Sequence, residues 1–156
     1  MLDKGANTVY KFDISGLITS DKSLKRTGVN DSSRPGRYLL KTIGGFGTAQ
    51  TKNKLLQPNS ISVYENRVYV LDVGNNCIKV FDLDFNYIKE INAPAIFNNP
   101  NYGKPVSITI DRYSNNSDKI FGYILSTKGR VFIYNIEKNK ISVTPSLYNF
   151  YDTRIN

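Results

Sequence analysis

The chain has 156 residues, 40% of them hydrophobic and 12% aromatic, which is the composition of a folded domain and excludes an intrinsically disordered chain. Its formal net charge of +8 is compatible with an anionic or acidic partner and also with a solvated, lysine-rich surface. It has no histidine, which excludes Ser-His and Cys-His nucleophile pairs, imidazole metal ligands and a histidine general base.

The first predicted unit, residues 1–24, is partial. Its alternating stretch Thr8–Asp13 and the following stretch Leu17–Ser20 predict two strands, and no strand is expected before them. Residues 25–42 are rich in Ser, Gly and charged side chains, which predicts a loop or linker.

The second unit, residues 43–93, is the clearest part of the chain. It opens with a glycine-rich turn, GGFG, and then alternates short apolar runs with turn residues such as Gly, Asn and Asp. This pattern predicts four antiparallel strands, at residues 60–63, 67–72, 77–82 and 87–91.

The third unit, residues 94–147, repeats this layout with small insertions. Strands are predicted at residues 105–110, 120–125, 130–135 and 140–143, with a polar loop over 111–119. The tail, residues 148–156, could start another strand or dock on a neighbour. Helical periodicity is hard to find in any unit, so the predicted fold class is all-β.

The second unit resembles an NHL repeat, a blade type of β-propellers. The family pattern places a proline before the first strand and continues into a V-x-D-x-G-N-x-x-I-x-V-F core. The matching signature residues are Pro58, Asp72, Gly74, Asn75, Ile78 and Phe81. The sequence departs from the pattern at Asn76 and Cys77, and the first and third units match only loosely.

The resemblance implies an incomplete β-propeller with about two and a half four-stranded, antiparallel NHL-like blades, whereas the family forms a closed ring of about six. Isolated blades leave apolar faces and strand edges uncovered. We therefore expect other proteins, or further copies of the chain, to complete the propeller.

Several motifs have a structural interpretation that we prefer to a functional one. GGFG lacks the Lys-Ser/Thr pair of a phosphate loop, so we interpret it as a turn between blades. Asp72 is interpreted as a carboxylate that caps turn amides, and Asp82 and Asp84 as turn residues. Cys77, the single cysteine, is expected to be a small buried residue. No catalytic residue, metal ligand or cofactor is predicted.

Basic side chains interleaved with tyrosines allow a second hypothesis, single-stranded RNA binding on a propeller face. The residues proposed to contact nucleic acid or an acidic partner are Arg67, Lys79, Lys104 and Arg130. Lysine-rich faces are less suited than arginine-rich ones to reading phosphates.

The function predicted from the sequence is that of a non-catalytic structural or adaptor module that binds proteins within a larger assembly. The abundance of Asn, Ile, Lys and Tyr suggests AT-rich coding, and by association a virion or phage-tail component. No secretory signal or membrane span is predicted, so a cytoplasmic or virion-associated location is expected. A third hypothesis is a fragment of an NHL-type lyase or lactonase.

Overall fold

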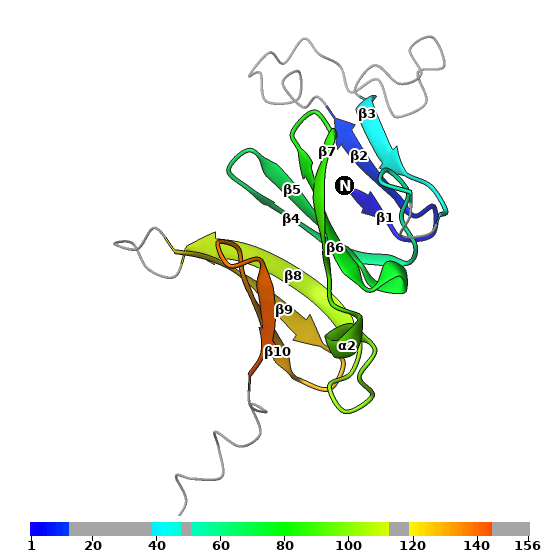
Figure 1. The fold of residues 1–156 in the computed structure, drawn as a ribbon. Helices are drawn as coiled ribbons and strands as arrows, with labels where there is room; N and C mark the ends of the chain where they lie inside the picture. Colours follow the sequence, from blue (N-terminus) through cyan, green and yellow to red (C-terminus); the bar gives the residue numbers. More distant parts are fainter. Residues whose placement is uncertain (13–38, 48–50, 113–118, 145–156) are drawn as a thin grey trace, which may run out of the picture.

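The computed structural model describes residues 1–12, 39–47, 51–112 and 119–144, and these residues form three antiparallel sheets that follow one another along the chain (Figure 1). Two short helical segments, η1 (Val73–Asn75) and α2 (Pro94–Phe97), interrupt the β structure. In the described part of the chain, no helix has the length and apolar character needed to cross a bilayer. The predicted all-β fold class is confirmed.

The second sheet is a complete blade, in which each strand pairs with the next one in sequence. Its strands are β4 (Pro58–Tyr64), β5 (Arg67–Asp72), β6 (Cys77–Asp82) and β7 (Tyr87–Asn92). The four strands predicted here are confirmed, with ends that differ by at most two residues. Positive φ angles at the intervening turns, 50° at Glu65 and 54° at Asn76, agree with the turn residues expected there.

The third sheet has the same order and is the second complete blade. Its strands are β8 (Pro105–Arg112), β9 (Ile120–Ser126), β10 (Val131–Asn135) and β11 (Lys140–Val143). All four strands were predicted. The polar loop expected over residues 111–119 starts later, because β8 continues to Arg112, and residues 113–118 lie outside the described residues.

The first sheet differs from the prediction at two strands. It has the order β1-β2-β3, formed by β1 (Leu2–Asp3), β2 (Thr8–Phe12) and β3 (Leu39–Gly44). β1 was not expected, since a strand of two residues has no visible alternation.

β3 corrects the C-terminal end of the linker predicted over residues 25–42. It pairs with β2 from Thr8↔Gly44 to Phe12↔Leu39, a contact between distant segments that local composition does not show. The predicted strand at residues 17–20, the rest of that linker and the tail at 148–156 lie outside the described residues.

The sheets pack face to face and enclose two cores, one on each side of the second sheet. Alternate residues of β5 serve the two sides: Val68 and Val70 pack toward the first sheet, Tyr69 and Leu71 toward the third. The second sheet is therefore buried on both faces, whereas the first and third sheets each turn one face away from the other sheets.

Candidate functional site

The carboxylate of Asp72 lies at the end of β5 and is fully buried. One of its oxygens accepts a hydrogen bond from the Leu56 amide at 2.7 Å, and the other accepts one from the Asn75 side chain at 2.8 Å. These bonds attach the turn at Val73–Asn75 to the segment that enters β4. The interpretation of Asp72 as a carboxylate that caps turn amides needs correction: it accepts the side-chain amide of Asn75, but it makes no capping bond to a backbone amide of the following turn.

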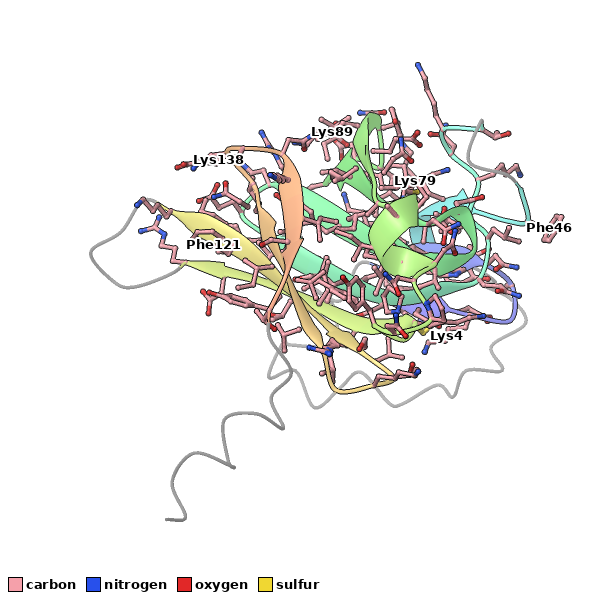
Figure 2. All side chains as sticks on the ribbon, turned by 60° about the horizontal axis from the view of Figure 1, so that its bottom comes forward. Lys4, Phe46, Lys79, Lys89, Phe121 and Lys138 are labelled. Atoms are coloured by element: carbon pink, nitrogen blue, oxygen red, sulfur yellow. The ribbon has the colours of Figure 1, made fainter. Side chains whose placement is uncertain are left out.

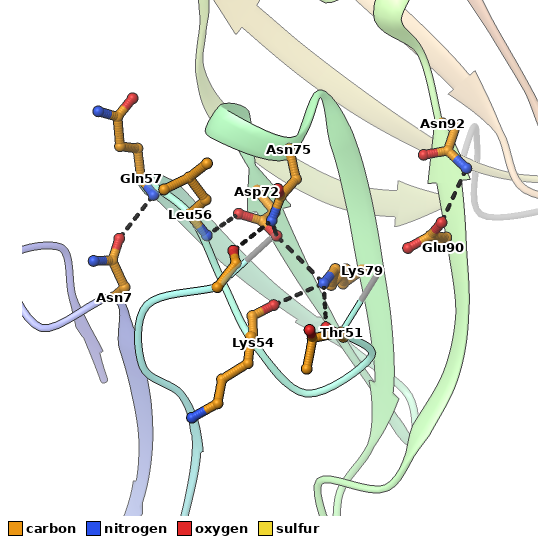
Figure 3. A network of polar contacts seen from close by, with 11 residues as sticks. Asn7, Thr51, Lys54, Leu56, Gln57, Asp72, Asn75, Lys79, Glu90 and Asn92 are labelled. Carbon is orange, nitrogen blue, oxygen red and sulfur yellow. Dashed lines mark hydrogen bonds and ion pairs between the residues drawn. The ribbon is translucent and has the colours of Figure 1, made fainter. Parts of the chain in front are cut away.

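Lys79 is also fully buried, and it lies in the same polar network (Figure 3). Its Nζ donates to the carbonyl oxygens of Thr51 at 2.9 Å and Lys54 at 2.7 Å, and it lies 3.7 Å from an Asp72 oxygen. Figure 2 shows Lys79 within the body of the molecule. The prediction that Lys79 contacts nucleic acid or an acidic partner is therefore wrong, because a lysine with no exposed surface cannot reach a ligand.

Burial dominates the electrostatics around this network. It raises the pKa of the Asp72 carboxyl above its ordinary value, and the bonds from Asn75 and Leu56 and the charge of Lys79 act in the opposite direction. Burial likewise raises the pKa of the neighbouring Cys77 thiol to about 12, so this thiol stays protonated at neutral pH. Cys77 is fully buried, as expected of a small core residue.

The remaining signature residues also hold the second sheet together. Pro58 starts β4 and is buried. Ile78 and Phe81 lie on β6 with no exposed surface and point to opposite sides, Ile78 into the core with the third sheet and Phe81 into the core with the first. None of the six signature residues therefore presents its side chain as a ligand-binding group in the described part of the chain.

Gly74 allows two backbone segments to approach closely. Its amide donates to the Leu56 carbonyl oxygen at 2.8 Å, and a Cβ added at Gly74 would lie 2.5 Å from that same oxygen. This distance is shorter than any normal van der Waals contact, so the signature glycine is required by close packing of the backbone.

We expect Gly74→Ala to lower the free energy of unfolding by about 1–3 kcal/mol, because the added methyl group must displace the Leu56 segment. Gly5→Ala is the matched control, since a Cβ at Gly5 would meet only the Asp3 side chain at 3.4 Å. Urea unfolding of the two variants and the parent protein measures the difference. Equal losses in both variants would contradict the role of close packing at Gly74.

The other basic residues predicted to bind ligands do not form one surface. Arg67 begins β5 and is exposed at one end of the second sheet. Lys104 and Arg130 lie at the opposite end of the blades, where the Lys104 amide donates to Thr127 Oγ1 and the Arg130 amide to Ser126 Oγ. A six-residue strand such as β5 is about 20 Å long, which separates Arg67 from the other two.

A basic groove that sequence reasoning missed lies between the first and second sheets. It encloses about 570 Å³, and three lysines, Lys41, Lys52 and Lys54, contribute to its lining. Lys52 Nζ lies 5.6 Å from the centre of the Tyr87 ring, and Lys41 Nζ donates to the Asp84 carbonyl oxygen. The groove can hold an anion, and its described lining contains no carboxylate, histidine or cysteine for acid-base or nucleophilic chemistry.

No three metal-ligating side chains of the His, Cys, Asp and Glu types gather anywhere in residues 1–12, 39–47, 51–112 or 119–144. Asp82, at the end of β6, accepts hydrogen bonds from the amides of Asn86 and Asp84. These bonds lower its pKa and confirm its interpretation as a turn residue.

Within the described residues, exposed apolar side chains lie on the two sheet faces at the ends of the stack. On the first sheet, Tyr10 and Phe12 stack with ring centres 6.1 Å apart on the face turned away from the second sheet, and Phe12 is 41% exposed. On the third sheet, Leu125 points away from the second sheet and is 45% exposed. Exposed apolar side chains that share a surface are typical of sites where proteins associate.

Comparison with known proteins identifies the repeat. Residues 55–81, from the segment before β4 to Phe81 in β6, match the family model of the NHL repeat. The predicted resemblance is confirmed for this segment. A search of curated proteins found no match above the significance threshold.

Among solved structures, one similar chain is described as "BBS1N in complex with ARL6DN, soaked with lead". It shares 15% sequence identity, with a TM-score of 0.43 over 60% of the present chain and 28% of the other. The present chain thus matches less than a third of the length of that protein.

Proposed function

Because residues 55–81 form an NHL repeat, we propose that this chain is a non-catalytic module that binds proteins through its propeller blades. The observation that supports this function is the exposed apolar surface at both ends of the stack, represented by Phe12 and Leu125. Within the stack, comparable faces are buried between neighbouring sheets. A stack of blades with uncovered ends gains stability when a protein covers them.

Crosslinking in cells that express the native protein tests this function. We expect a stoichiometric protein crosslinked to lysines near the end faces, such as the exposed Lys4 and Lys140. Leu125→Lys together with Phe12→Lys should abolish these crosslinks. Ile88→Lys, at a similarly exposed position (42%) on the outer strand of the middle sheet, should preserve them. A chain that remains uncrosslinked at every concentration would contradict the proposal.

The basic groove supports a second candidate function, the binding of a phosphate-rich ligand such as single-stranded RNA. It places Lys41, Lys52 and Lys54 beside the Tyr87 ring, which combines positive charge with an aromatic surface. Binding of a labelled oligouridine should weaken steeply as salt is raised and should be lost in Lys52→Glu. Lys128→Glu, in the turn between β9 and β10 of the third sheet and outside the groove lining, is the control.

The finer hypotheses depend on what is bound. A place in a virion or phage tail would be supported if the crosslinked protein were a particle component. A tightly bound metal in the purified protein would support the alternative of an NHL-type lyase or lactonase fragment.

A further inference from the structure

The outer face of the third sheet repeats the face with which the second sheet binds the third. The second sheet presents Tyr69 and Leu71 on β5 and Ile78 and Val80 on β6 to the third sheet, and all four are buried there. Their strand pairing is Tyr69↔Val80 and Leu71↔Ile78.

The third sheet carries the same four positions on its uncovered side. The pairs are Tyr123↔Ile133 and Leu125↔Val131, so a tyrosine, a leucine and two β-branched residues recur in the same arrangement on β9 and β10. Leu71 has no exposed surface, whereas its counterpart Leu125 is 45% exposed. Polar side chains would be sufficient at these four positions if the face stayed in water. The apolar side chains found there therefore indicate a surface that packs against another blade.

The face that packs on Tyr69, Leu71, Ile78 and Val80 belongs to the third sheet. Phe132 and Tyr134 of β10 contribute two aromatic rings to it, and both are fully buried. Strand pairing identifies their counterparts in the first sheet, because Leu2↔Val9 in β1 and β2 matches Leu125↔Val131 in β9 and β10.

By this register, Tyr10 occupies the position of Phe132, and Phe12 occupies the position of Tyr134. The two rings stack on the uncovered side of the first sheet, and Phe12 is 41% exposed. The third sheet therefore ends the stack with an apolar face like the one that binds a sheet within the chain. The first sheet ends it with an aromatic pair equivalent to Phe132 and Tyr134, which pack on such a face within the chain.

We infer that two copies of this chain associate head to tail, with Tyr123, Leu125, Val131 and Ile133 of one copy packed against Tyr10 and Phe12 of the other. The inference rests on the proposed protein-binding function and names the partner as a second copy. The two faces differ, so the contact is heterologous, and such contacts close into a ring when the rotation between copies permits it. Two copies supply six sheets, within the range of about four to eight blades found in propellers, whereas three copies would exceed it.

The test is the solution mass of the full chain over a range of concentrations, by sedimentation equilibrium. The parent protein should form a dimer. Leu125→Lys and Phe12→Lys should each weaken association at least tenfold, and Ile88→Lys should leave it unchanged. All three residues are exposed in the single chain, so circular dichroism and the thermal midpoint should stay close to those of the parent. If a lysine variant folds poorly, the milder Leu125→Ala and Phe12→Ala replace it, and each should also weaken association relative to the parent protein.

Mixing the two variants gives the decisive readout. Each lysine variant alone should be monomeric, but an equimolar mixture should form heterodimers, because Leu125→Lys retains an intact Phe12 and Phe12→Lys retains an intact Leu125. If two copies instead associated symmetrically through the same end face of each, the variant altered at the other end face would still dimerise by itself. This result would overturn the inference.

A monomeric parent protein at high concentration would also overturn the inference. The protein-binding function would then still be judged by the crosslinking experiment in cells. A self-associating chain that crosslinks to no other protein would support the head-to-tail contact and assign the binding function to the second copy.

Discussion

Asp72→Ala is expected to lower the free energy of unfolding by about 3–5 kcal/mol, the cost typical of breaking a buried ion pair by removing one partner. The variant leaves the ammonium group of Lys79 buried, with only the Thr51 and Lys54 carbonyl oxygens as partners. It also removes the acceptor of the Leu56 amide. Urea unfolding at neutral pH, at a concentration where the chain is monomeric, measures the loss.

Two controls separate the buried pair from a general effect of the substitution. Asp3 occupies the same position of the first sheet, accepts the Ala6 amide at 3.0 Å and is exposed, so Asp3→Ala should cost less than about 1 kcal/mol. Adding Lys79→Met to Asp72→Ala removes the unpaired charge and should recover much of the stability. A double variant no more stable than Asp72→Ala would contradict this explanation.

Phe81→Ala is expected to destabilise the fold by a similar amount, about 3–5 kcal/mol, because it opens a cavity in a packed core. The ring has no exposed surface, belongs to the core between the first and second sheets, and meets Tyr87 edge to face at 6.0 Å. The loss is measured by the same unfolding experiment.

Phe12→Ala is the matched control for Phe81→Ala. Phe12 occupies the same position of the repeat but is 41% exposed in the single chain, so its removal should cost less than about 1 kcal/mol in the monomer. The same variant should weaken the association of two copies. If Phe12→Ala destabilised the monomer as strongly as Phe81→Ala, the outer face of the first sheet would have to be covered within the chain.

Much of the fold could be predicted because the strand signals are local. The alternation in β4 to β7 and in β8 to β11 places each strand within one or two residues of its observed position, and Gly, Asn and Asp mark the turns. β1 was not predicted because it has only two residues, and β3 was not predicted because it pairs with β2 across an intervening segment of the chain.

One signal in the sequence would have found β1. Leu2, Asp3, Gly5 and Asn7 recur as Leu71, Asp72, Gly74 and Asn76 at the same 69-residue step that relates Phe12 to Phe81. The first sheet thus begins with the turn motif of the second. The motif does not show which copy of each residue is buried, since that depends on what lies beside it.

The sequence by itself determined the repeat, the strands of the two complete blades and the turns between those strands, because these depend on residues close together in the chain. Only the tertiary structure decided that Lys79 is buried, since its partners are carbonyl oxygens of a segment packed on it from more than 20 residues earlier. The tertiary structure also decided which of two equivalent residues is buried. Leu71 and Phe81 are covered by neighbouring sheets, whereas their counterparts Leu125 and Phe12 are exposed at the ends of the stack. Burial depends on neighbours that no local pattern specifies, so the surfaces open to a partner become visible only when the sheets are assembled.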